Sequence, residues 1–387
     1  MSNKVTTVIE NGHLVLENGI VWDGVLLIEG ERIVAFGNVK EMETFVPKDA
    51  KVIDAKGAYV GPGFVDIHVH GGGGYSTCYE PVEAAEFFLR HGETTILATP
   101  FYGMNFKQLL EAIRCIKSNL VNAKTIRGIY MEGPYTNPKY GAQKHENPWE
   151  GLIEAEQYEA LVDEAGELAR VWTIAPERSG LMPFLEYARK VKPDVVFAVG
   201  HSEATPAEIR RLGKYRPTLQ THSMNATGRI KTFGGTRDFG PDEYCMKEPD
   251  VYAEMISDSC GIHVHPEMQQ LLLHNKGIHR TVLITDSTVY SNPVPEKYGQ
   301  VQDLNFDSRG GIAGSKMTMN LACRNIMTHT NCGIAQAFLM ASSNPARAVG
   351  LDNEVGTIES GKRADLVFVD DKFQVQQVVL GGELCQF

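Results

Sequence analysis

Short apolar segments recur through the middle of the chain, and a stretch with helical spacing follows most of them. Segments of this length and composition are typical of buried strands. The eight segments are Phe64–Ile67, Thr94–Ala98, Gly128–Met131, Val171–Ile174, Val195–Val199, Thr218–Thr221, Tyr252–Ser257 and Thr281–Thr285. The helical stretches between them include Pro81–His91, Phe106–Leu120, Ile153–Ala169, Pro183–Lys192 and Pro206–Leu212. Eight strands that alternate with helices predict an α/β fold of the (β/α)₈ TIM-barrel class.

The two ends of the chain differ from the middle in their pattern of apolar residues and turns. Short β-type runs separated by Gly, Asn and Asp occupy the first 60 residues, and similar runs return at 365–369 and 375–380. Two β-rich ends around a long middle predict one small β-sandwich domain built from both termini. We therefore expect residues 1–58 and 352–387 to form this domain and residues 59–351 to form the barrel.

Composition narrows the classes of partner. The 387 residues are 43% hydrophobic and 22% charged, an ordinary balance for a globular protein with a sizeable core. A net charge of −11 argues against nucleic acid as a partner. The seven Cys are odd in number and form no CxxC pair, so neither a disulfide framework nor a Cys zinc site is expected. The N-terminus lacks an apolar signal region, and no run of about 18 apolar residues occurs, so we expect a cytoplasmic protein without a membrane partner.

Histidines and carboxylates stand just past the ends of the predicted strands, where barrel enzymes carry their active sites. Six residues share this placement: His68, His70, Glu132, His201, His222 and Asp286. Side chains in a strand alternate with period two, so the two histidines of the His-x-His pair point to the same face. All six can therefore surround one point at the mouth of the barrel.

Each of these residues also has an ordinary interpretation. The His-x-His pair could lie on a surface strand, Glu132 could form a salt bridge, His201 and His222 could be hydrogen-bonded core residues, and Asp286 could cap the following segment. Their combination around one mouth favours a metal site. A divalent ion lowers the pKa of its water to about 7 and polarises a carbonyl, which makes amide hydrolysis feasible at neutral pH. Zn²⁺ and Fe²⁺ both accept His and carboxylate ligands, so the sequence leaves the ion open.

The same motifs, read in order, carry a family resemblance. The chain contains GPGFVDIHVHG, EGPY, GHSEAT, THSMNAT, GIHVHP, TDST and IAGS, and it closes with GTIESGKRADLVFVD. In this order the motifs resemble the amidohydrolase superfamily and, within it, the N-acetylglucosamine-6-phosphate deacetylases. The resemblance covers nearly the whole chain.

The resemblance implies a role for each matching residue. Glu132, His201 and His222 correspond to the main metal ligands. His68 and His70 imply a second ion bridged by Glu132, so one or two ions are expected per subunit. Asp286 corresponds to the catalytic base and proton shuttle, and we also expect it among the metal ligands. The positions implied as substrate contacts are Ala142, Gln143, Asn225, Ala226, His263, Ile312, Ala313 and Gly314, together with Arg237, which would reach the sugar phosphate across a homodimer interface.

Some residues depart from the family pattern on the substrate side. The segment THSMNAT differs from the usual sequence, Cys260 replaces an Asp, and Asp238 and Phe239 follow Arg237 in place of Glu and Pro. The expected function is removal of the N-acetyl group from an amino-sugar phosphate, with N-acetylglucosamine 6-phosphate giving glucosamine 6-phosphate and acetate. The alternatives are another N-acetylhexosamine phosphate, an N-acyl amino acid, or a non-catalytic binding protein that keeps a metal site for structure.

Overall fold

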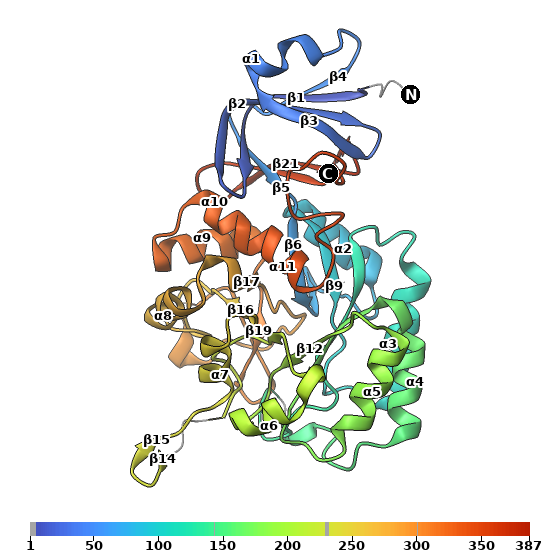
Figure 1. Ribbon diagram of the computed structural model, residues 1–387, viewed down its shortest axis with the longest axis vertical. Helices are drawn as coiled ribbons and strands as arrows, with labels where there is room; N and C mark the ends of the chain where they lie inside the picture. The colour runs from blue at the N-terminus through green and yellow to red at the C-terminus, as the bar shows by residue number, and fades with distance from the viewer. Residues whose placement is uncertain (1–4, 143, 229–231, 300) are drawn as a thin grey trace.

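The computed structural model describes residues 5–142, 144–228, 232–299 and 301–387, and its larger part is a parallel barrel (Figure 1). Eight strands form this sheet, each hydrogen-bonded to the next along the chain. They are β6 (Phe64–Val69), β9 (Glu93–Ala98), β10 (Ile126–Met131), β11 (Ala169–Ile174), β12 (Val196–Val199), β13 (Leu219–Gln220), β16 (Tyr252–Ile256) and β17 (Thr281–Ile284). All eight predicted strands occur, and the predicted α/β TIM-barrel class is confirmed.

The first and last barrel strands are tied together at their carboxyl ends. The backbone N–H of Asp286 donates to the carbonyl of His68 at 3.0 Å, and the N–H of His70 donates to the carbonyl of Ser287 at 2.9 Å. Below them the hydroxyl of Thr285 donates to the buried carboxyl group of Asp66, whose pKa burial raises to about 7. The barrel therefore closes at the same edge at which the candidate functional residues stand.

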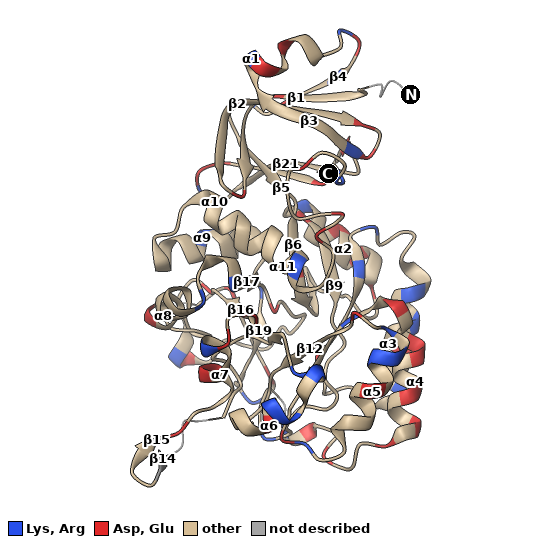
Figure 2. Ribbon diagram, in the orientation of Figure 1, with Lys and Arg blue, Asp and Glu red and all other residues tan. Residues whose placement is uncertain are grey.

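Helices cover the outside of the barrel. They are α2 (Pro81–Arg90), α3 (Phe106–Asn119), α4 (Ala155–Ala165), α5 (Leu181–Val191), α6 (Pro206–Arg211), α7 (Pro241–Lys247), α8 (Pro266–Lys276), α9 (Met319–Thr330), α10 (Ile334–Phe338) and α11 (Asn344–Ala348). Helix α3 starts at a capping box in which Asn105 and Gln108 satisfy each other's backbone N–H groups. Figure 2 shows acidic and basic residues interspersed on α3, α4 and α5, where Glu164 pairs with Arg114 at 2.8 Å.

Two regions differ from the predicted elements. The helix expected over Ile153–Ala169 ends at Ala165, because Gly166 takes a positive φ of 52° and a short 3₁₀ turn follows before β11. The Gly-rich stretch before the seventh strand holds a hairpin of β14 (Thr232–Phe233) and β15 (Thr236–Arg237), which projects away from the barrel (Figure 1). In the part of the chain that the structure describes, no helix is long and apolar enough to cross a membrane.

Both termini join in a second sheet beside the barrel. Its strands are β1 (Thr7–Leu16), β2 (Gly19–Glu29), β3 (Arg32–Asn38), β4 (Lys51–Asp54), β5 (Tyr59–Pro62), β20 (Leu366–Val369), β21 (Val375–Leu380) and β22 (Glu383–Leu384). Side chains of β1, β2, β5 and β20 share one buried cluster, so the sheet curls around its own core. Strand β5, which follows the expected boundary at residue 58, pairs within this sheet. The division of the chain into two domains stays a prediction.

Phe338 of α10 joins the two parts. Its ring stacks on Phe64 of the first barrel strand with the ring centroids 5.4 Å apart and lies 5.3 Å from the ring of Phe373. On its other side it lies against the backbone of Gly61 in β5, where a Cβ atom would come within 2.2 Å of the ring. Only glycine leaves room for this contact, because a Cβ at residue 61 would have to displace the closely packed ring of Phe338.

We predict that Gly61→Ala lowers the free energy of unfolding by about 1–3 kcal/mol, because an added methyl group overpacks the contact with Phe338. Chemical denaturation followed by circular dichroism measures this change as a lower midpoint. Gly151→Ala is the matched control, since a Cβ there meets no atom within 4 Å. Equal midpoints for the two variants would contradict the packing argument.

Candidate metal centre and active site

The six predicted strand-end residues come together at the mouth of the barrel. His68 is in β6 and His70 follows its end, while Glu132 follows β10 directly. The remaining three, His201, His222 and Asp286, each stand two residues beyond a strand, after β12, β13 and β17 respectively. Because the carboxyl ends of parallel barrel strands share one rim, residues far apart in the sequence become neighbours there.

Glu132, His201 and His222 form the tightest cluster. The Nε2 atom of His201 lies 2.7 Å from Oε1 of Glu132, and Nε2 of His222 lies 3.1 Å from the same oxygen. The two Nε2 atoms are 3.0 Å apart, and all three side chains are buried. Three protein ligands with room for a further group on one side are typical of a catalytic rather than a structural metal site.

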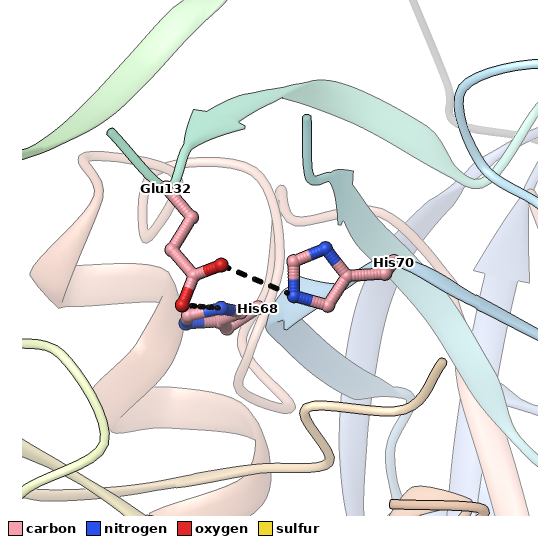
Figure 3. Close-up of side chains that lie close together, drawn as sticks. All are labelled: His68, His70 and Glu132. Carbon is pink, nitrogen blue, oxygen red and sulfur yellow. Dashed lines mark ion pairs between the residues drawn. The ribbon is translucent and has the colours of Figure 1, made fainter. Parts of the chain in front are cut away.

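Glu132 also belongs to a second cluster with the His-x-His pair. Its carboxylate faces both rings, with His68 Nε2 at 3.7 Å from Oε1 and His70 Nε2 at 3.5 Å from Oε2 (Figure 3). The ligand atoms of each three-residue cluster lie within 4.8 Å of one another. Asp286 closes the arrangement, because its Oδ1 is 3.2 Å from Nε2 of His70. One carboxylate is thus shared between two groups of histidines.

The hydrogen bonds on the far side of the rings orient them. Nδ1 of His68 lies 3.1 Å from Oε2 of Glu254, Nδ1 of His70 lies 2.8 Å from the carbonyl of Thr99, and Nδ1 of His222 lies 3.2 Å from the carbonyl of Asn225. Each acceptor takes an N–H from Nδ1, so Nε2 is the ring nitrogen that faces the centre of the site.

The converging nitrogens and oxygens fit a divalent cation. Nε2 of His68 is buried and has no hydrogen-bond partner among the described residues. Ring nitrogens that converge on one another and on a carboxylate need positive charge between them, carried either by protons or by a cation. The donor set of imidazole nitrogens and carboxylate oxygens is one that Zn²⁺ and Fe²⁺ accept.

The ionisation of the site residues also favours a bound cation. Burial lowers the pKa of His68, but the hydrogen bond to Glu254 and the charges of Glu254 and Glu132 outweigh it and raise the pKa to about 10. Burial opposes ionisation of Glu132, yet His201 and His222 hold its pKa well below the usual range. The pKa of Asp286 is likewise lowered on balance, by its hydrogen bond to His70 and by the histidine charges against the effect of burial. The carboxylates are therefore ionised and create a negative potential that favours a cation.

Three of the site residues have a left-handed backbone. The φ angles of His201, His222 and Asp286 are 46°, 25° and 47°. Residues with a Cβ adopt such angles at a cost of about 1–2 kcal/mol, and they persist only where the surrounding structure holds them. Here the strain turns each side chain from the end of its strand towards the centre.

A cavity of about 230 Å³ opens above these side chains. Most of the predicted substrate contacts line it, namely Ala142, Asn225, Ala226, His263, Ile312, Ala313 and Gly314. His70, Glu132, His201, His222 and Asp286 line it as well, while His68 is buried and is not part of its wall. Gln143 lies outside the described residues. Arg237 stands in the projecting hairpin, and its side chain lies outside what the structure describes.

Three residues that support the site were missed by the sequence analysis. Glu254 holds both the ring of His68 and, at 3.0 Å, the backbone N–H of His222. Asp258 accepts from the His263 ring at 3.1 Å, and Tyr102 donates its hydroxyl to the carbonyl of Ala142 at 2.8 Å. A carboxylate inside the apolar seventh strand was a usable signal for Glu254, because a buried charge requires a partner.

Comparison with known proteins identifies the family. The family model described as "Amidohydrolase family" matches residues 59–385. N-acetylglucosamine-6-phosphate deacetylase from Bacillus subtilis is 30% identical over 96% of this chain and 95% of its own length. N-acetylgalactosamine-6-phosphate deacetylase from Escherichia coli O157:H7 is 27% identical over 84% of this chain and 87% of its own.

A solved structure agrees over the same span. A mutant of N-acetyl-D-glucosamine-6-phosphate deacetylase from Mycobacterium smegmatis, in complex with N-acetyl-D-glucosamine-6-phosphate, superposes with a TM-score of 0.81 at 26% identity. The match covers 98% of this chain and 99% of the other. The chain therefore belongs to the amidohydrolase family, in the branch of the N-acetylglucosamine-6-phosphate deacetylases, and is an enzyme that hydrolyses an amide.

Proposed function

We propose that the protein hydrolyses the N-acetyl group of N-acetylglucosamine 6-phosphate, giving glucosamine 6-phosphate and acetate. The observation that carries the proposal is the convergence of His201, His222 and Glu132 beside the ionised carboxylate of Asp286, at the floor of a cavity. The deacetylase relatives support the choice of substrate.

Glu132, His201 and His222 would hold the principal ion, and His68 and His70 would hold a second one with Glu132 shared between them. Zn²⁺ and Fe²⁺ both suit this donor set. When bound, a divalent ion supplies a water of lowered pKa and a Lewis acid for the carbonyl. Glu254 and the carbonyl of Thr99 hold the His68 and His70 rings through Nδ1, so that Nε2 of each would face such an ion.

Asp286 would carry the proton. Its lowered pKa leaves the carboxylate free to accept a proton from the attacking water, and its position at the cavity wall allows it to deliver that proton to the leaving amine nitrogen. The amide C–N bond breaks, the water oxygen joins the acyl carbon, and the amine leaves protonated. Asp286 is thereby returned to its ionised state.

The sugar would lie against the polar side of the cavity. Asn225, Ala226, His263 and the backbone at 312–314 would contact its hydroxyl groups, and Ala142 would lie near the reacting carbonyl. Asp258 fixes the His263 ring through Nδ1, which leaves Nε2 without a partner among the described residues and available to the substrate.

Three alternatives compete with this proposal. The similarity to an N-acetylgalactosamine-6-phosphate deacetylase favours the galactosamine isomer as the second candidate substrate. An N-acyl amino acid is a further possibility, and a non-catalytic protein would bind metal without releasing acetate. Metal analysis combined with an acetate assay on both sugar phosphates and on N-acetyl amino acids distinguishes all of these.

We predict that Glu254→Gln weakens metal binding roughly 10- to 100-fold. The neutral amide holds the His68 ring less firmly and makes the ring a less basic ligand. Competition with a chelator of known affinity measures the change. His222→Ala removes a proposed ligand and shows how far metal affinity falls when the site is lost. Glu86→Gln on the exposed face of α2 is the matched control. Metal affinity equal to that of the control would exclude Glu254 from the site.

We predict that Asp286→Asn lowers kcat on the order of 10²-fold or more, since the amide keeps the shape of the side chain but cannot accept a proton. Metal content and KM should stay close to those of the unchanged protein. Acetate release in steady-state kinetics and metal analysis of the same preparation measure both. Near-normal turnover by a metal-replete variant would remove Asp286 from the mechanism.

The phosphate group needs a cation from outside the described cavity wall, because no Lys or Arg stands among the described lining residues. Arg237 is our candidate, reaching the site from the partner subunit of a homodimer. A guanidinium can hold two phosphate oxygens at once. The protein should therefore release acetate from N-acetylglucosamine 6-phosphate far faster than from N-acetylglucosamine.

We predict that Arg237→Ala raises KM for the phosphorylated sugar by roughly one to two orders of magnitude and leaves the unphosphorylated sugar almost unaffected. Asp238→Asn, at the next position, controls for changes in the hairpin itself. Equal losses on both sugars would argue that Arg237 does not bind phosphate and would favour an unphosphorylated substrate.

A further inference from the structure

The loop after β13 carries both a proposed metal ligand and proposed substrate contacts. His222 stands two residues beyond the strand, and Asn225 and Ala226 line the cavity. The backbone of this loop is left-handed at three positions, with φ angles of 25° at His222, 66° at Met224 and 51° at Ala226. Residues with a Cβ rarely adopt such angles, so a loop that contains three of them needs neighbours that hold it.

One carboxylate binds this loop at its start, its middle and its end. Oδ1 of Asp242 accepts hydrogen bonds from the side-chain amide of Gln220 and from the backbone N–H of Met224, the latter at 2.9 Å. Its Oδ2 accepts from the hydroxyl of Thr227 at 2.6 Å. Gln220 is the last residue of β13 and is 1% exposed, so its amide group requires such a partner. The carboxylate thus connects the strained loop to the end of the strand that precedes it.

Asp242 belongs to a different part of the structure from the loop that it binds. It lies in the first turn of α7, the helix that returns the chain from the projecting hairpin to the outside of the barrel (Figure 1). Helix α7 has supports of its own. The backbone N–H of Gly240 donates to Glu243 at 3.0 Å, and Lys276 of α8 donates to the carbonyl of Cys245 at 2.9 Å. The carboxylate is therefore held in place from outside the loop.

We propose that Asp242 is a positioning residue for sugar binding, which holds the loop after β13 so that Asn225 and Ala226 face the cavity. This inference rests on the proposed function, because it takes these two residues as contacts of the sugar. The metal centre has a separate support, since Glu254 accepts from the backbone N–H of His222 at 3.0 Å. Loss of the Asp242 carboxylate therefore weakens sugar binding more than it slows the chemical step.

Asp242→Asn keeps the size of the side chain but replaces one acceptor oxygen by an amide donor. We expect KM for N-acetylglucosamine 6-phosphate to rise about five- to tenfold, with kcat and metal content within about twofold of the unchanged protein. Acetate release by the metal-loaded protein and metal analysis measure these quantities. Glu243→Gln, at the next position of α7, is the matched control, because it loosens the contact with Gly240 and should leave KM unchanged.

A normal KM for Asp242→Asn would overturn the inference. Loss of metal together with a large fall in kcat would also overturn it, because Asp242 would then support the metal centre. Both outcomes leave the proposed function standing. If the unchanged, metal-loaded protein released no acetate, the proposed function would fail and this inference with it.

A second comparison separates the loop from phosphate binding, because Asp242 lies in the helix that follows the hairpin of Arg237. Asp242→Asn should lower kcat/KM by the same factor for N-acetylglucosamine and for its 6-phosphate, since the loop would contact the sugar itself. Arg237→Ala is predicted to affect the phosphorylated sugar alone. A loss confined to the phosphorylated sugar in Asp242→Asn would show that Asp242 supports the hairpin instead, and it would overturn the inference.

Thr227→Val tests the same contact from the side of the loop and leaves α7 unchanged. It removes the hydroxyl that donates to Asp242 and should raise KM about two- to fivefold. In the double variant the two effects should not multiply, because both substitutions break one contact. Effects that multiply would show that the two residues act independently and would overturn the inference. Circular dichroism checks folding, and if Asp242→Asn does not fold, a normal KM for Thr227→Val overturns the inference by itself.

Discussion

Four imidazole rings and two carboxylates can share one buried site only if their lone pairs and charges converge on something positive. The Nε2 atoms of His201 and His222 lie 3.0 Å apart, and both contact one oxygen of Glu132. In surroundings of low dielectric this arrangement is costly unless a cation or protons neutralise it. Hydrogen bonds at Nδ1 of His68, His70 and His222 keep the Nε2 atoms of these three rings turned inwards, so the chemistry of the site follows from this one constraint.

The barrel holds the side chains of the site rigidly in place. Hydrogen bonds between the ends of β6 and β17 hold His68 and Asp286 in a fixed register. The left-handed backbone at His201, His222 and Asp286 turns their side chains inwards at a local cost that the closed sheet absorbs. A loop without such support would relax to an ordinary conformation, and the ligand atoms would separate.

Substrate selection depends on parts of the structure that are less constrained. Most of the proposed substrate contacts stand on loops beyond the strand ends, so they can change without moving the proposed metal ligands. The departures of the sequence from the family pattern lie near Asn225, Cys260 and Arg237, while the proposed ligand residues match that pattern. The sheet formed by the termini contacts the opposite part of the barrel through Gly61 and Phe338, where the packing is close.

The sequence by itself determined the barrel, its eight strands and the residues gathered at its mouth, because hydrophobic periodicity and the placement of polar residues after strands are local properties. It did not reveal Glu254 as the partner of His68, since that contact joins residues 186 positions apart across the barrel. It also did not predict that α4 ends at Ala165. The positive φ of Gly166 ends the helix although the apolar pattern continues to Ala169. The composition of the cavity wall was decided by tertiary structure alone. Cys78, Met104 and Val289 follow three different strands, and only closure of the barrel makes their side chains parts of one surface.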